Sequence, residues 1–122
     1  MGREWAKGMV HPDHLTTPVF EEILQMICRK DDAVFEAQIA ALLNRPDATG
    51  LLSEIACPTL VMCGREDTWS PLERHIEMQE SIRGAELAII EHSGHMITME
   101  QPQGVSQALA RWLDAGPGEE KA

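Results

Sequence analysis

The sequence predicts an α/β fold that contains two parallel strands joined by a crossover helix. Two short apolar runs, at residues 58–64 and 86–91, have the length of buried strands and lie next to proline or glycine. Each run is followed by a segment with helical spacing of apolar residues, so residues 58–113 read strand, helix, strand, helix. Strands connected in this order run parallel, with a right-handed crossover.

Residues 1–50 are expected to form an N-terminal loop and two helices. Residues 1–16 show no apolar period and are interpreted as a loop or a poorly ordered entry. A first helix is predicted over residues 17–28, because threonine caps helices and proline is tolerated at the first helical position. A second helix is predicted over residues 31–43, and Pro46 follows its end.

Residues 51–114 are assigned to the α/β unit, and residues 115–122 to a disordered tail. The elements expected within the unit are a short connection to residue 56, a strand over 59–63, a helix over about 72–83, a strand over 87–90 and a helix over about 102–113. The segment Ser70-Pro71-Leu72-Glu73 fits a capping box with Ser70 as the N-cap, and Gly84 is expected to stop that helix.

Composition and charge exclude several classes of function. The chain has 122 residues, enough for one domain, and its formal charge of −10 repels phosphate backbones and anionic lipid. We therefore expect no nucleic-acid partner and no membrane partner. The longest apolar run, residues 39–43, is far shorter than the roughly 20 residues of a spanning helix. No secretory signal is recognisable, and three cysteines without a Cys-x-x-Cys motif are interpreted as reduced thiols in the cytoplasm.

Asp67 and His95 are the candidate catalytic pair. Asp67 follows the first strand by four residues and His95 follows the second by five. Neighbouring parallel strands lie about 4.8 Å apart, so these two loops can meet beyond the carboxyl ends of the strands. A carboxylate that accepts a hydrogen bond from one ring nitrogen leaves the other nitrogen as a general base. The alternative interpretation is that both residues only form turns.

Several motifs in the second half of the chain occur in the order and spacing of a known family. They are residues 57–67 with Gly64-x-x-Asp67, Pro71, residues 84–87, Gly94-His95 and Glu100-Gln101-Pro102. Together they resemble the C-terminal part of the α/β-hydrolase fold family. In that family the Gly-x-x-Asp supplies the acid of a Ser-Asp-His triad and the Gly-His supplies its base. The resemblance is specific over residues 51–113, and the helices within residues 16–50 look like late cap helices.

The family's nucleophile has no counterpart among these residues. It lies in a Gly-x-Ser-x-Gly turn upstream of the cap. None of the five serines has that context: Ser53, Ser70, Ser81, Ser93 and Ser106. The chain is therefore expected to correspond to the C-terminal half of a hydrolase and to be inactive alone.

Trp69 and Met96 are candidates for substrate binding. Trp69 lies close to Asp67 in sequence, and it either faces a substrate cavity or anchors its loop. Met96 follows His95, and it either lines an apolar pocket or fills a gap in the core.

No metal or organic cofactor is expected. His11-x-x-His14 and His92-x-x-His95 could each supply two metal ligands, but no third ligand stands at a recognisable position. The triad chemistry that the resemblance implies needs no cofactor.

Two classes of function follow from these observations. In the first, the chain is part of an enzyme that hydrolyses a small ester, lactone or related carbonyl compound, once a nucleophile-bearing N-terminal half is present. In the second, it is a non-catalytic remnant or interaction module that pairs through its sheet edge. A two-stranded sheet leaves each outer edge unpaired, so the expected partners are a second copy or the complementary hydrolase half.

Overall fold

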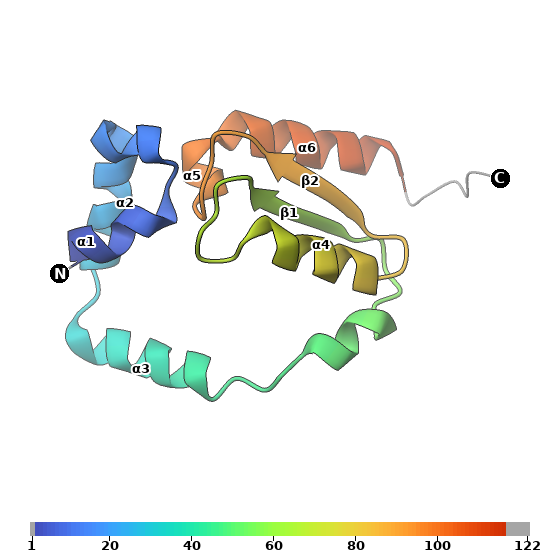
Figure 1. Cartoon of the computed structure of the whole chain (residues 1–122), viewed down its shortest axis with the longest axis horizontal. Helices are drawn as coiled ribbons and strands as arrows, with labels where there is room; N and C mark the ends of the chain where they lie inside the picture. Colours follow the sequence, from blue (N-terminus) through green and yellow to red (C-terminus); the bar gives the residue numbers. More distant parts are fainter. Residues whose placement is uncertain (1, 117–122) are drawn as a thin grey trace.

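The computed structural model describes residues 2–116 (Figure 1). A run of helices comes first, and strands and helices alternate only from residue 60 onward. In order they are α1 (Gly2–Ala6), η1 (Lys7–Met9), η2 (Pro12–Thr16), α2 (Pro18–Cys28), α3 (Asp32–Leu43), η3 (Thr49–Glu54), β1 (Leu60–Gly64), α4 (Leu72–Ser81), β2 (Glu86–Ile90), α5 (Ile97–Glu100) and α6 (Pro102–Asp114), where η denotes a 3₁₀ helix.

The predicted α/β unit is confirmed. Strands β1 and β2 pair in parallel, from Leu60 opposite Glu86 to Gly64 opposite Ile90, and α4 connects them. Helices α4 and α6 lie on opposite sides of the strand pair (Figure 1). An apolar cluster lies on each side of the sheet: Val61, Ile82 and Ala85 on the α4 side, and Ile90, Val105 and Ala108 on the α6 side.

The interpretation of residues 1–16 as a loop is wrong. These residues form α1, η1 and η2, and they pack against α2. Ala6, Met9 and Val10 are spaced as on one helical face and are buried together with three residues of α2: Phe20, Ile23 and Leu24. Three apolar residues within residues 6–10 form too short a stretch to show a helical period in the sequence. Burial against α2 supplies the stability that this segment lacks alone.

The prediction of a capping box at Ser70 is also wrong. Pro71 occupies the N-cap position of α4 without a side-chain bond to the helix, and the backbone N–H of Ser70 is donated to Asp67 instead. Helix α4 ends at Ser81, two residues earlier than expected, and Gly84 adopts a left-handed conformation with φ of 76°. Helix α5 was not predicted. Of the expected disordered tail, residues 115–122, the part from residue 117 onward lies outside the described residues.

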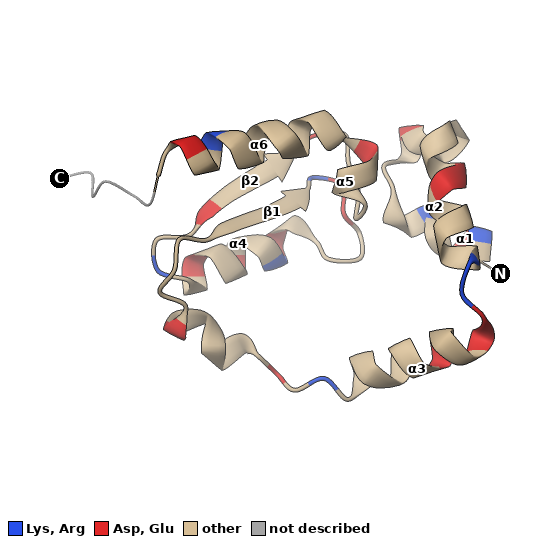
Figure 2. Cartoon of the chain, turned by 180° about the vertical axis from the view of Figure 1, so that it is seen from behind, with Lys and Arg blue, Asp and Glu red and all other residues tan. Residues whose placement is uncertain are grey.

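Helix α3 differs from the other long helices because every one of its residues is exposed. It runs apart from the strand pair in both views of the chain (Figures 1 and 2). Its exposed apolar residues are Val34, Phe35, Ile39, Leu42 and Leu43. Within residues 2–116, no helix has both the length and the apolar character required to cross a membrane.

Candidate active site

Asp67 lies in the loop after β1, with its side chain only 4% exposed. Its Oδ1 accepts hydrogen bonds from the backbone N–H groups of Trp69 and Ser70, both at 2.9 Å. These two bonds are a local turn of the kind that aspartate favours, and they fix the orientation of the carboxylate. Oδ2 is therefore directed at a partner from another part of the chain.

That partner is His95, in the loop after β2. Its Nδ1 lies 2.8 Å from Oδ2 of Asp67, so the predicted contact between the two side chains is present. The imidazole is 39% exposed while the carboxylate is buried. With the Nδ1 proton shared with Asp67, Nε2 carries the lone pair that a general base needs.

Two glycines allow the loops to approach so closely. A Cβ atom on Gly64 would lie 2.2 Å from the carbonyl oxygens of Ser93 and Gly94, and one on Gly94 would lie 2.8 Å from the carbonyl oxygen of Met9. Any side chain at either position would clash with backbone. The N–H of His95 also donates to the carbonyl of Met9 at 2.7 Å, so the N-terminal segment supports the histidine directly.

Glu100, at the end of α5, is a buried residue that connects the N-terminal segment to the loop of His95. Its buried carboxylate accepts from the backbone N–H groups of His11, Gly94 and Met96, at 2.6, 2.9 and 3.2 Å. It also contacts Nδ1 of His14 at 2.9 Å and the hydroxyl of Ser93 at 3.3 Å. The motif at residues 100–102 contributed to the family resemblance, but nothing in the sequence indicated that this carboxylate is buried.

The two candidate substrate residues have different surroundings. Trp69 is 40% exposed, and its ring centroid lies 5.6 Å from that of His95 and 4.5 Å from that of Trp5. Met96 is partly buried against the N-terminal apolar cluster. Neither lines the hollow of about 400 Å³ beside Asp67, whose walls are Lys7, Gly8, Val10, Pro12, Arg65, Glu66, Asp67 and Thr68. Their role in substrate binding stays a prediction.

Two other residues near the pair have nucleophilic side chains but unsuitable surroundings. Cys63, at the end of β1, is 2% exposed, and its pKa is raised, first by burial and then by the charge of Asp67. Its thiol therefore stays protonated. Ser93 is fully buried, and its hydroxyl is directed at Glu100. Neither residue is arranged as a nucleophile for His95.

The two His-x-x-His pairs of the sequence differ in the structure. His11 and His14 stay near each other, with ring centroids 5.9 Å apart, although Nδ1 of His14 contacts Glu100. His95 contacts Asp67, whereas His92 lies beside His11 with ring centroids 5.3 Å apart.

Comparisons with known proteins find similar sequences. Residues 37–121 match the family described as TAP-like protein. A 2-hydroxy-6-oxononadienedioate/2-hydroxy-6-oxononatrienedioate hydrolase of Klebsiella pneumoniae is 31% identical over 102 residues, which cover 81% of this chain and 35% of that protein. The chain spans between a quarter and about a third of the length of the curated relatives it matches.

Solved structures show the same fold. An esterase from Thermogutta terrifontis superposes with a TM-score of 0.87 at 33% identity, over 93% of this chain and 42% of the esterase. MGS-M2, an alpha/beta hydrolase enzyme from a deep-sea metagenome library, superposes with a TM-score of 0.74 at 20% identity, over 99% of this chain and 48% of that chain.

Proposed function

Because the chain belongs to the TAP-like family of α/β-hydrolases, we propose that Asp67 and His95 are the acid and base of a Ser-Asp-His triad. The observation that carries this proposal is the 2.8 Å contact between Nδ1 of His95 and Oδ2 of Asp67. The two backbone hydrogen bonds to Oδ1 support the proposal, because they fix the orientation of the carboxylate and leave Oδ2 for His95.

The chemistry that this pair can perform is proton transfer. Nε2 of His95 would accept the proton of a serine hydroxyl as that oxygen attacks a carbonyl carbon, and would then donate it to the leaving group. Asp67 would stabilise the imidazolium formed in between. The serine and the oxyanion-binding N–H groups have to come from a nucleophile-bearing half, since no Gly-x-Ser-x-Gly occurs in these 122 residues.

The substrate class that we propose is a small ester, lactone or related carbonyl compound. The names of the similar proteins support it: one is an esterase, and another acts on oxo-dienedioates and oxo-trienedioates. Trp69, whose ring centroid lies 5.6 Å from that of His95, and Met96, the residue after His95, are the residues that we expect to contact the substrate. We place the protein in the cytoplasm, because all three cysteines are free thiols, as in reducing compartments.

A second candidate function is that of an interaction module. The exposed apolar residues of α3 favour it, since a helix of this kind is usually covered by another surface. A complementary hydrolase half would cover that surface and supply the nucleophile at the same time. A second copy of this chain would only cover the surface.

A chimera tests the catalytic proposal. The segment of the Thermogutta terrifontis esterase that superposes on this chain is replaced by this chain, and hydrolysis of p-nitrophenyl acetate is measured. We expect hydrolysis by the chimera, and a fall in kcat of about 10⁴-fold for Asp67→Asn or His95→Ala within it. His75→Ala, on α4, is the matched control and should leave the rate unchanged.

The isolated chain provides the baseline for the same assay. It should hydrolyse the ester no faster than free imidazole does, and no serine should react with a fluorophosphonate. A folded His95→Ala chimera with the rate of the parent chimera would disprove the catalytic role. Stoichiometric labelling of a serine in the isolated chain would show that a nucleophile lies within these residues.

A further inference from the structure

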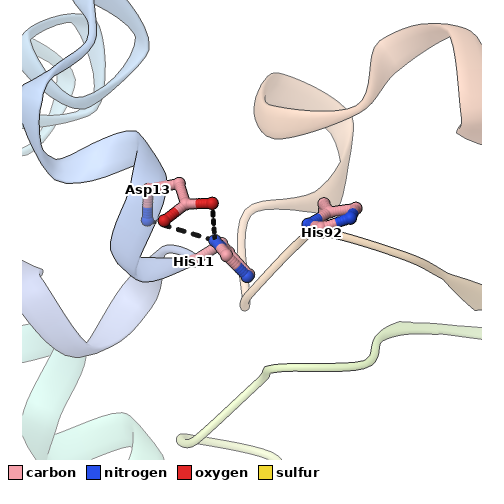
Figure 3. A group of neighbouring side chains, drawn as sticks. All are labelled: His11, Asp13 and His92. Carbon is pink, nitrogen blue, oxygen red and sulfur yellow. Dashed lines mark hydrogen bonds and ion pairs between the residues drawn. The ribbon is translucent and has the colours of Figure 1, made fainter.

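Two histidines from distant parts of the chain meet beside an aspartate (Figure 3). His11 is the N-cap residue of η2, Asp13 lies within η2, and His92 lies in the loop that follows β2. One potential ligand atom from each of the three residues lies within 4.8 Å of the other two. The imidazole of His11 is only 14% exposed, whereas Asp13 and His92 are exposed.

His11 already uses the lone pair of its Nδ1 in a hydrogen bond within η2. The backbone N–H of Asp13 donates to Nδ1 at 3.1 Å, which requires a lone pair on that nitrogen and places the ring proton on Nε2. Oδ2 of Asp13 lies 3.8 Å from the same Nδ1, and Oε1 of Glu66 lies 3.9 Å from Nε2. A metal at Nδ1 therefore has to displace the exposed hydrogen bond from Asp13, while Nε2 keeps its proton. Glu66 is too far from Nε2 for a hydrogen bond, but it lies on the side where a carboxylate usually orients a ligating imidazole.

The backbones that carry the two histidines are fastened to one buried group. Glu100 accepts the N–H of His11 at 2.6 Å and the N–H of Gly94, two residues after His92, at 2.9 Å. His92 itself has φ of 51°, in the left-handed region. The backbone positions of the two histidines are therefore fixed by their contacts to Glu100.

We propose that His11, Asp13 and His92 bind a divalent transition metal, with Zn²⁺ as the ion that suits two imidazoles and one carboxylate. Neighbouring donors in a tetrahedral zinc site lie about 3.4 Å apart, so donors now within 4.8 Å have to approach by at most about 1.4 Å. The exposed side chains of Asp13 and His92 can turn to achieve this. The ion links η2 to the loop after β2, and three protein ligands leave its fourth position for water. This proposal is independent of the proposed hydrolase activity.

Calorimetric titration of the tag-free chain with ZnCl₂ tests the site. The exposed thiols of Cys28 and Cys57 also bind zinc, so every variant carries Cys28→Ser and Cys57→Ser. The ligand variants are His11→Asn, Asp13→Asn and His92→Asn. Asparagine is chosen because it caps helices at position 11 and tolerates the left-handed backbone at position 92. His75→Asn, on α4, is the matched control.

We expect one Zn²⁺ per chain in the parent and in the His75→Asn control, and affinity at least about ten-fold weaker in each ligand variant. Zinc should also raise the melting temperature of the parent but not of His92→Asn, and circular dichroism verifies that each variant is folded. The proposal is overturned if the parent binds no zinc, or if folded His11→Asn and His92→Asn variants bind it as tightly as the parent.

Discussion

Glu100 shows at the level of a single residue how a buried charge can organise a site. It is surrounded by donors from two segments, residues 11–14 and 93–96, and within the described residues no buried side-chain polar atom is left without a partner. The second segment contains His95. The position of the candidate base therefore depends on a carboxylate that does not contact it.

Replacing Glu100 with alanine should destabilise the chain by at least about 3 kcal/mol. The substitution leaves several buried N–H donors unsatisfied, and each of these costs about 1–3 kcal/mol. Glu80→Ala, at an exposed position of α4, should change the free energy of unfolding by no more than about 0.5 kcal/mol. Urea denaturation followed by circular dichroism measures both. A loss below 1 kcal/mol for Glu100→Ala would contradict the organising role of this carboxylate.

Cys63 should be the least reactive of the three cysteines. Burial and the neighbouring charge of Asp67 raise its pKa, so the thiolate that reacts with alkylating reagents is scarce at pH 8. Cys28 and Cys57 are exposed. Iodoacetamide should therefore modify those two in the folded chain, and Cys63 only after denaturation, as measured by peptide mass mapping. Equal labelling of all three cysteines in the folded chain would contradict this account.

At the level of elements, α3 differs from the helices that pack against the strand pair or within the N-terminal cluster, which consists of Ala6, Met9, Val10, Phe20, Ile23 and Leu24. Helix α2 buries Phe20, Ile23 and Leu24, and α6 buries Val105 and Ala108. Helix α3 buries none of its residues, and its described aromatic contact is the edge-to-face pair of Phe35 with Trp5. Helices of about 12 residues are marginally stable without tertiary packing.

Amides of α3 should consequently exchange with deuterium faster than amides of α2. The two helices have 12 and 11 residues, so α2 serves as a control of matched length in the same chain. The physical reason is that opening α3 exposes no buried apolar surface, whereas opening α2 disrupts the N-terminal cluster. Exchange followed by mass spectrometry measures the difference. Equal protection of the two helices would show that α3 is covered in solution.

For the whole molecule, the main consequence of the fold is that strand edges and apolar side chains are exposed. Among the described residues the sheet has two strands, so β1 and β2 each have one unpaired edge. Exposed edges and exposed apolar helices both favour association. The formal charge of −10 opposes association by repulsion between copies.

We expect the isolated chain either to self-associate or to be partly unfolded at micromolar concentration. Size-exclusion chromatography with light scattering measures its molar mass against the 13.6 kDa of one chain. Leu42→Glu, on the exposed face of α3, should lower the associated fraction if that face makes the contact, and should leave it unchanged if the strand edges do. A compact monomer that melts cooperatively would contradict the expectation.

The sequence alone determined the α/β unit and the place of the candidate pair. Short apolar runs next to proline and glycine located both strands. The loops after parallel strands end at one edge of the sheet, so Asp67 and His95 could meet there, and the family resemblance favoured that they do. These features depend on local pattern and on the handedness of the crossover. They can therefore be read from the order of the residues.

Only the tertiary structure decided how the N-terminal segment, Glu100 and His11 are used. Residues 1–16 fold because α2 covers Ala6, Met9 and Val10, and Glu100 is buried because donors from residues 11 and 94 converge on it. His11 meets His92, 81 positions away in the chain, for the same reason. Each of these contacts joins residues that are far apart in the chain, and the free energy that forms them comes from packing, which no local spacing reveals.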